Sequence, residues 1–216
     1  MLKIIRAGMY TSVQDGGREG LRQLGISRCG AMDKPALVTA NLLVGNGANA
    51  AALEITLGQV DIQFERSGWF ALTGAACEAK LDGEPVWVGW RTAVKAGQHL
   101  VLKNPQHGVR SYLAVAGGDC GAEGAGFAQH RSESGDWRSG RSTLQDGDRL
   151  KLGKSDKQFR GPRGVKQLPI GNRIRALPGA RVPGSLIACR RTRSGARRGS
   201  LARRAIVWAI VCRGNR

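Results

Sequence analysis

The stretch WFALTGA, residues 69–75, decides the fold class of this chain. It is a short run of aromatic, aliphatic and threonine side chains with a glycine near its end, and such runs are typical of β-strands. Runs of the same kind occur elsewhere in the first 118 residues: LKIIRAG (2–8), VDIQFE (60–65), VWVGW (86–90), HLVLK (99–103) and SYLAVAGG (111–118). Their regular spacing predicts a mainly β fold with few helices, built as a closed or sandwiched sheet. Within VWVGW, Trp87 and Trp90 are expected in the core.

One helix is predicted over residues 34–44. Asp33 stands in the N-cap position, and Pro35 lies in the first turn, where its missing N–H costs no hydrogen bond. Gly45 follows the last turn and is the expected stop signal. Apolar residues at positions i, i+3 and i+7 predict one buried stripe, made of Leu37, Ala40 and Val44.

Between the first strand and the helix lies TSVQDGGREGLRQLGISRCGAMD, residues 11–33, which we predict to be a glycine-punctuated loop. Glycines allow a positive φ and a close approach to a ligand, and successive N–H groups in such turns can form an anion-binding nest. Gln14, Asp15 and Arg18 would then offer an amide, a carboxylate and a guanidinium to one small polar ligand. The alternative is a structural turn that Asp15 caps, with Arg18 in solvent.

The formal net charge of +18 is unevenly distributed along the 216 residues. Residues 180–216 contain ten arginines and no lysine, aspartate or glutamate, so this segment carries 10 of the 18 net charges. A basic surface gains affinity for nucleic acid by releasing counterions from the phosphates. Because the charge is gathered in one segment, we expect no specific nucleic-acid partner, and a basic nucleic-acid-binding protein is only a remote alternative.

Several other classes of protein are disfavoured. The five cysteines form no CxxC pair and the three histidines are scattered, so no metal site is predicted. The apolar run AIVWAIVC (205–212) has eight residues, whereas a membrane-spanning helix needs about 20. The sequence GDRLKLGKS (147–155) has five residues between its glycines where a phosphate-binding P-loop has four, and it is predicted to be a turn followed by a strand. No leader opens the chain, so we expect a cytoplasmic protein without a membrane partner.

The regular pattern fails in two places. Residues 119–141, DCGAEGAGFAQHRSESGDWRSGR, have neither the period of a strand nor that of a helix. Pattern returns in TLQDGDRLKLGKS (143–155) and GVKQLPIGNRIRAL (164–177), and it disappears again after Gly179.

The ordered motifs resemble a known family. TSVQDGGREGLRQLGISRCGAMD, NLLVGN, ALEITLG, ALTGA, VKAGQHL and SYLAVAGG are similar to the biotin-dependent carboxyltransferase-like family that includes allophanate hydrolase subunit 2, and most of all to its branch of 5-oxoprolinase C subunits. The resemblance covers residues 1–118 almost continuously, and then residues 143–179. It implies a cyclophilin-like β-barrel lobe of the carboxyltransferase type, with a second lobe that is incomplete in this chain.

The resemblance also implies a function and partners. The A, B and C subunits of such complexes together open 5-oxo-L-proline to L-glutamate with hydrolysis of ATP. The B and C subunits are expected to activate the lactam by phosphorylation, and the A subunit to complete the hydrolysis. ATP, with Mg²⁺, would be shared with the partner subunit, and no biotin is expected on this chain. The resemblance leaves two alternatives. One is a regulatory binding protein that antagonises a kinase inhibitor, and the other is a subunit of the carboxyltransferase or allophanate hydrolase type.

The family patterns VQDxGRxG and GAMD place the implied site in residues 13–20 and 30–33. The implied catalytic residues are Gln14, Asp15 and Arg18, with Arg18 as a carboxylate or phosphate clamp. The implied substrate- or phosphate-binding residues are Gly16, Gly17, Gly20, Gly30 and Asp33.

The chain departs from the family where its pattern fails. The family carries a GSRSTD-type motif soon after AVAGG, and this chain has none. Permissible codons for residues 119–140, read one base later, can give that motif, and codons from Ser185 onward, read two bases later, can give a family-like continuation. We therefore predict that 119–142 and 180–216 are translated out of frame, that the basic tail ends at an out-of-frame stop and is disordered, and that 143–179 begins the second part. This copy is then expected to be inactive.

Overall fold

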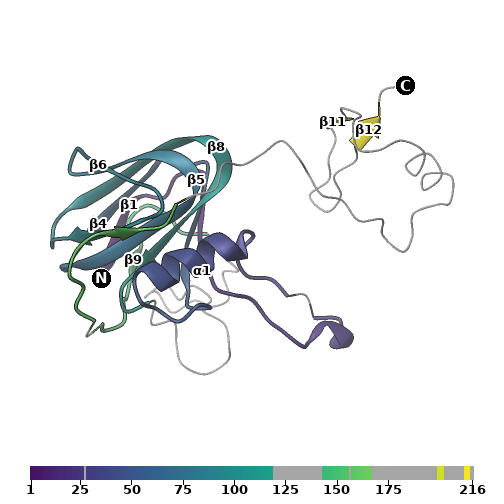
Figure 1. Cartoon of the computed structure of the whole chain (residues 1–216), viewed down its shortest axis with the longest axis horizontal. Helices are drawn as coiled ribbons and strands as arrows, with labels where there is room; N and C mark the ends of the chain where they lie inside the picture. The colour runs from purple at the N-terminus through teal and green to yellow at the C-terminus, as the bar shows by residue number, and fades with distance from the viewer. Residues whose placement is uncertain (27, 119–142, 156, 167–198, 202–211, 215–216) are drawn as a thin grey trace. The chain divides into compact units, whose positions relative to one another are not determined.

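The computed structural model describes residues 1–26, 28–118, 143–155, 157–166, 199–201 and 212–214 (Figure 1). Within these residues, the first of two compact units, Met1–Leu168, contains a ten-stranded antiparallel sheet and one α-helix, α1. The elements of this unit are β1 (Leu2–Arg6), β2 (Tyr10–Gln14), the 3₁₀ turn η1 (Arg22–Leu24), α1 (Lys34–Leu43), β3 (Ala52–Thr56), β4 (Val60–Phe64), β5 (Gly68–Leu81), β6 (Glu84–Val86), β7 (Trp90–Val94), β8 (His99–Val115), β9 (Arg149–Leu150) and β10 (Arg163–Gly164). The mainly β prediction is thus confirmed.

The two longest strands, β5 and β8, form the spine of the sheet, because they pair along most of their length. The other edge of β8 pairs first with β4 and then with β3. From β4 the sheet continues through β1 to β9, whereas from β3 it continues to β2. The sheet therefore forks along β8, and the fork places β2 and β3 beside the C-terminal half of that strand.

β8 replaces what the sequence predicts as two separate strands, residues 99–103 and 111–118. The residues between them include Pro105 and Gly108, which normally interrupt a strand. Here the pairing with β5 shifts register between Gly74 and Ala79 instead of ending. Such bulges bend and twist a strand while the sheet continues. The proline and the glycine therefore mark an irregular middle of one strand.

Apolar side chains pack on both faces of the sheet. One face buries the main core, in which Phe64 and Phe70 stack with ring centroids 5.2 Å apart. The other face is covered by α1 (Figure 1). The helix packs there against small side chains of three strands, namely Ala52, Ala71, Ala114 and the neighbouring Ala116. Small side chains let a helix approach a sheet closely, so α1 is held at a fixed place over β5 and β8.

The predicted helix is confirmed within one residue of its end. Asp33 caps it, since its Oδ1 accepts a hydrogen bond from the amide of Ala36 at 3.1 Å. The predicted stripe of Leu37, Ala40 and Val44 is fully buried, at 0% exposure for each residue. Gly45 follows the helix with a φ of 70°, the left-handed conformation expected at a helix stop.

Two expectations are wrong. The segment 11–33 is not a loop throughout, because residues as far as Gln14 belong to β2, which pairs with β3. Trp87 and Trp90 are not core residues, since they are 71% and 44% exposed. VWVGW is not one strand; it contains the turn between β6 and β7, in which the amide of Trp90 donates to the carbonyl of Trp87 at 3.3 Å, and both rings lie outside the packed faces.

The described part of segment 143–179 adds β9 and β10 to the sheet of the first unit, where they pair with β1 and β7. The predicted out-of-frame segment 119–142 lies outside the described residues, as does most of the tail 180–216. In the second unit, Pro169–Arg216, two three-residue strands that the sequence does not predict, β11 (Gly199–Leu201) and β12 (Cys212–Gly214), pair antiparallel.

Candidate functional site

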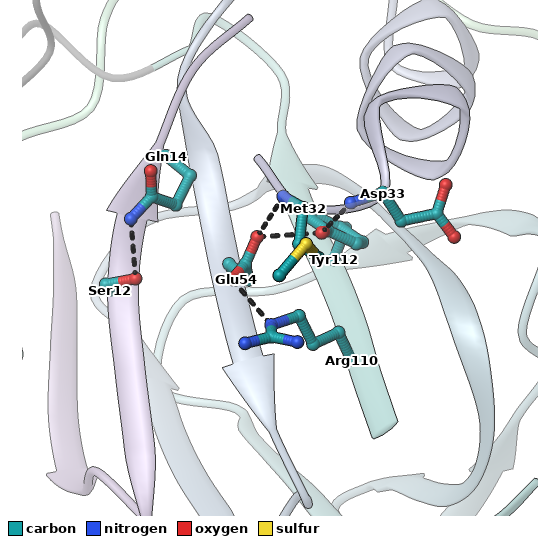
Figure 2. A network of polar contacts seen from close by, with 7 residues as sticks. All are labelled: Ser12, Gln14, Met32, Asp33, Glu54, Arg110 and Tyr112. Atoms are coloured by element: carbon teal, nitrogen blue, oxygen red, sulfur yellow. Dashed lines mark hydrogen bonds and ion pairs between the residues drawn. The ribbon is translucent and has the colours of Figure 1, made fainter. Parts of the chain in front are cut away.

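A buried row of polar side chains crosses four strands beside the N-terminus of α1. Ser12 on β2 lies opposite Glu54 on β3, Glu54 lies opposite Tyr112 on β8, and Tyr112 lies opposite Thr73 on β5. Directly opposed residues in a sheet share one face, so these side chains stand in line. Each of the four is at most 5% exposed. Buried polar side chains require partners. Figure 2 shows those of Ser12, Glu54 and Tyr112, and the Thr73 hydroxyl donates to the Ala36 carbonyl at 2.8 Å.

Glu54 is the centre of this network (Figure 2). Its Oε1 accepts from Arg110 Nε at 2.9 Å, and its Oε2 accepts from the Tyr112 hydroxyl at 2.7 Å and from the amide of Met32 at 2.9 Å. Burying an unpaired carboxylate is costly, and three donors, one of them cationic, offset that cost here. Glu54 thereby ties β3 to β8 and to the residues that lead into α1.

The Tyr112 hydroxyl continues the network toward the helix, because it accepts a hydrogen bond from the amide of Asp33 at 2.7 Å. Burial raises the pKa of Tyr112 well above the ordinary tyrosine value, and the neighbouring carboxylate of Glu54 raises it further. Tyr112 is therefore neutral at physiological pH and donates its proton to Glu54.

Arg110 belongs to the adjacent row, in which Tyr10, Thr56 and Arg110 lie opposite one another on β2, β3 and β8. Its side chain is 31% exposed, and within the described part of the chain only its Nε makes a hydrogen bond or ion pair. The Thr56 hydroxyl is enclosed and has no hydrogen-bond partner there. Tyr10 is 40% exposed, so this row lies where the buried network reaches the surface.

Gln14 lies at the end of β2, where its Nε2 donates to Ser12 Oγ at 3.0 Å (Figure 2). Since residues two apart on a strand share a face, Gln14 is on the same side of the sheet as the Glu54 network. The structure thus brings this predicted catalytic residue to the polar face of the sheet.

Asp15, Gly17 and Gly30 lie close together in the segment between β2 and α1. This segment extends away from the sheet (Figure 1). Asp15 Oδ1 accepts from the Gly17 amide at 2.7 Å, and its carbonyl accepts from the Ala31 amide at 2.9 Å. Gly17 has a φ of 74°, and a Cβ on it would lie 2.5 Å from the Cys29 carbonyl oxygen. A Cβ on Gly30 would lie 2.5 Å from the Gly17 nitrogen. These glycines let the two sides of the segment touch.

Five amides at the two ends of this segment already donate within the protein. Those of Gly16 and Arg18 bond the carbonyls of Asn49 and Arg28 at 3.4 and 2.7 Å. Those of Gly17, Met32 and Asp33 bond Asp15, Glu54 and Tyr112. An anion-binding nest needs free N–H groups, so these five amides cannot form one without exchanging bonds.

Further along the segment, Gly20 is exposed. Apart from its two chain neighbours, no residue has a heavy atom within 4 Å of the place where a Cβ on Gly20 would lie. Glu19 Oε1 accepts from Arg28 Nη2 at 2.8 Å and from Lys34 Nζ at 2.9 Å. These two cations lower the pKa of the exposed Glu19. The structure does not bring Gly20 together with Gln14, and the implied roles of Gln14, Asp15 and Arg18 stay predictions.

Sequence reasoning missed Glu54, Arg110 and Tyr112. A signal for the first is present, because ALEIT places one carboxylate inside an apolar strand, and such a residue must find donors when the strand is buried. Nothing local identifies the donors, since Arg110 and Tyr112 lie 56 and 58 residues further along the chain.

Other classes of site have little support among the described residues. No group of three or more histidine, cysteine, aspartate or glutamate side chains could hold a metal ion there. No described helix has the length and apolar character to cross a membrane. In GDRLKLGKS a turn is followed by the two-residue strand β9, which agrees in kind with the predicted turn and strand but begins one residue before LKLG, the part expected to be the strand.

The comparisons with known proteins identify the family. A model described as "Carboxyltransferase domain, subdomain A and B" matches residues 24–189, a range that contains the whole Glu54 network except Ser12 and Gln14. The chain belongs to this carboxyltransferase domain family.

Two relatives are more specific. The chain is 63% identical over 179 residues to the C subunit of 5-oxoprolinase from Escherichia coli (strain K12), and the match covers 83% of this chain and 58% of that protein. It is 39% identical over 180 residues to the C subunit of 5-oxoprolinase from Haemophilus influenzae, where the match covers 82% and 57%. The chain therefore spans less than three fifths of the length of these two relatives.

Solved structures agree with this family. The crystal structure of TTHA0988 superposes with a TM-score of 0.69 at 32% identity, covering 85% of this chain and 68% of that one. The urea carboxylase of Kluyveromyces lactis superposes with a TM-score of 0.63 at 28% identity, covering 76% of this chain and 15% of that one. The carboxyltransferase-type fold expected from the resemblance is confirmed.

Proposed function

We propose that this chain is the C-type subunit of a cytoplasmic, ATP-dependent 5-oxoprolinase, which acts with A-type and B-type subunits to open 5-oxo-L-proline to L-glutamate. The observation that carries the proposal is the 63% identity over 179 residues to the C subunit of the E. coli 5-oxoprolinase. The polar face around Glu54 supports it, because it provides a fixed guanidinium at the edge of a buried network.

The chemistry of the reaction fits such a face. A lactam is a resonance-stabilised amide, and it becomes labile once its oxygen carries phosphate. Negative charge develops during that transfer, and oriented donors stabilise it. The described residues offer Arg110 for this purpose. Five amides of the glycine-rich segment, those of Gly16, Gly17, Arg18, Met32 and Asp33, do not fit the role of a phosphate cradle, because they are bonded within the protein, and we assign no ATP contact to them.

We also propose that residues 119–142 and 180–216 are read out of frame and that this copy is inactive. The support is the loss of periodicity over 119–141 and the GSRSTD-type motif that a shifted reading of this segment can supply. That reading restores the motif at the place where the family has it.

Both proposals are tested in one assay. The chain and a frame-restored version are each purified with A-type and B-type subunits, and L-glutamate is measured with 5-oxo-L-proline and ATP. We expect no 5-oxoproline-dependent glutamate from the chain as it stands and steady turnover from the restored version. Turnover by the chain at the restored rate would refute inactivity. A restored chain that joins the complex without giving glutamate would refute the 5-oxoprolinase function.

A carboxyltransferase component is the second candidate. It is favoured by the 40% identity over 118 residues to a putative urea carboxylase of Emericella nidulans, where the match covers 54% of this chain and 10% of that protein. Carboxyl transfer from carboxybiotin to an acceptor amide, without glutamate formation, would favour this candidate over the first.

A further inference from the structure

We propose that Arg110 is an anion-binding residue of this lobe, that Glu54 positions it, and that its ligand is a carboxylate or phosphate group. The inference deepens the proposed function, because 5-oxo-L-proline carries a carboxylate and its activation involves phosphate. It assigns the contact to a residue outside the glycine-rich segment that the sequence singled out.

The first argument is the orientation of the guanidinium. Arg110 Nε donates to Glu54 Oε1 at 2.9 Å, and a bond at Nε fixes the plane of the whole group. Neither Nη makes a hydrogen bond or ion pair within the described residues, so the fork that suits the two oxygens of a carboxylate or phosphate is left open.

The second argument is the fixity of Glu54. Its side chain is 7% exposed, and its other oxygen is held by Tyr112 and by the Met32 amide. Rotating Glu54 toward another partner would break bonds to two separate segments and leave a buried carboxylate short of donors. Glu54 therefore stays in place, and its bond to Nε holds the Arg110 guanidinium in one orientation.

The third argument is the contrast with the other arginines. Arg91 uses both Nη groups, which donate to the carbonyls of Leu43 and Gly161 at 3.2 and 2.8 Å. Arg149 also binds a carboxylate through Nε, that of Glu65 at 3.3 Å, but its side chain is 53% exposed and Glu65 is 27% exposed. Arg149 is thus the matched control: the same kind of pair, loosely held in solvent.

The surroundings of Arg110 suit a small anion. Tyr10 and Met32 are 40% and 63% exposed, and both lie next to the network that holds Arg110. The open fork of the partly exposed Arg110 therefore lies near exposed side chains, where a small anion can reach it.

The test follows the Nε–Hε resonances of Arg110 and Arg149 by NMR in the full-length chain. The probes are 5-oxo-L-proline and, separately, inorganic phosphate. We expect a saturable shift at Arg110 with at least one probe and no saturable shift at Arg149. A response to 5-oxo-L-proline alone identifies a carboxylate site, and a response to phosphate alone identifies a phosphate site. No saturable shift at Arg110 with either probe would overturn the inference.

Variants separate binding from folding. Arg110→Lys keeps the charge and loses the fork, so the affinity should fall about tenfold or more, whereas Arg149→Lys should leave it unchanged. Glu54→Asp withdraws the carboxylate, so the Arg110 Nε–Hε proton should exchange faster with water and the affinity should fall. Glu54→Gln keeps the length of the side chain and an acceptor oxygen. Its Nε–Hε exchange rate and its affinity should therefore lie between those of the wild-type chain and Glu54→Asp. Unchanged affinity in Arg110→Lys or Glu54→Asp chains that keep the wild-type backbone spectrum would overturn it.

The outcome is independent of the 5-oxoprolinase proposal. A chain whose Arg110 binds an anion, but whose frame-restored version makes no glutamate with the A-type and B-type subunits, refutes that function and leaves this inference standing. Glutamate formation without any response at Arg110 overturns this inference alone.

Discussion

At the scale of single residues, Tyr112 joins two segments through one oxygen, which donates to Glu54 and accepts from the Asp33 amide, each at 2.7 Å. Tyr112→Phe removes both bonds and leaves a buried carboxylate oxygen with one donor fewer. We expect the free energy of unfolding to fall by about 1–3 kcal/mol at neutral pH, measured by urea denaturation. Ser111→Ala, next to it on β8, is the control.

The same hydroxyl predicts how stability depends on pH. The pKa of Tyr112 is raised in the folded chain, mainly by burial, so folding favours its protonated form. This contribution is complete below the pKa of an unfolded tyrosine, about 10, and is lost as pH rises beyond that value toward the folded pKa. The wild-type chain should therefore lose more stability than Tyr112→Phe between neutral pH and about pH 11. Parallel loss in both chains would contradict this.

Single residues also show how much of the structure can be predicted from the sequence. The cap at Asp33 is predictable because its partner, Ala36, lies three residues away. The Glu54 network is not, because its members meet only after β3 and β8 pair, and that pairing depends on the whole sheet. Gln14 lies on the face that carries the Glu54 network, but its role stays a prediction, and its place on a strand does not follow from the family pattern.

At the scale of elements, α1 depends on its N-cap. Asp33→Ala removes the bond to the Ala36 amide and should lower the free energy of unfolding by about 1 kcal/mol, whereas Asp33→Asn keeps an acceptor and should cost less. Urea denaturation of the three chains measures this. If Asp33→Asn cost as much as Asp33→Ala, the role of Asp33 would lie in its charge and not in the cap.

The helix was predictable from its local sequence, whereas β2 and the unbroken course of β8 depend on their pairing partners and were not. The helix begins and ends at signals contained in residues 33–45. β2 has a sequence typical of a polar loop and becomes a strand because β3 offers it an edge. β8 continues through Pro105 and Gly108 because β5 remains paired with it, with a shift of register at these positions.

At the scale of the whole molecule, charge is the property that the fold does not explain. Of the 18 net positive charges, 10 lie in residues 180–216. The full chain should bind DNA without sequence preference, and the logarithm of its affinity should fall linearly with the logarithm of salt concentration. A chain that ends at Gly179 should lose most of this binding. Equal binding by both chains, measured by fluorescence anisotropy, would place the basic surface on the folded lobe.

The bonds of Glu54 also bear on the order in which the chain assembles. They join residues that are 22 and 58 positions apart, and the Asp33 amide reaches Tyr112 across 79 positions. Contacts between residues so distant in sequence require large loops to close and so favour slow folding. α1 can form early from its own signals, whereas the bonds that hold Met32 and Asp33, just before the helix, need Glu54 on β3 and Tyr112 on β8 in place. We therefore expect the docking of the helix onto the sheet to be a late event in folding.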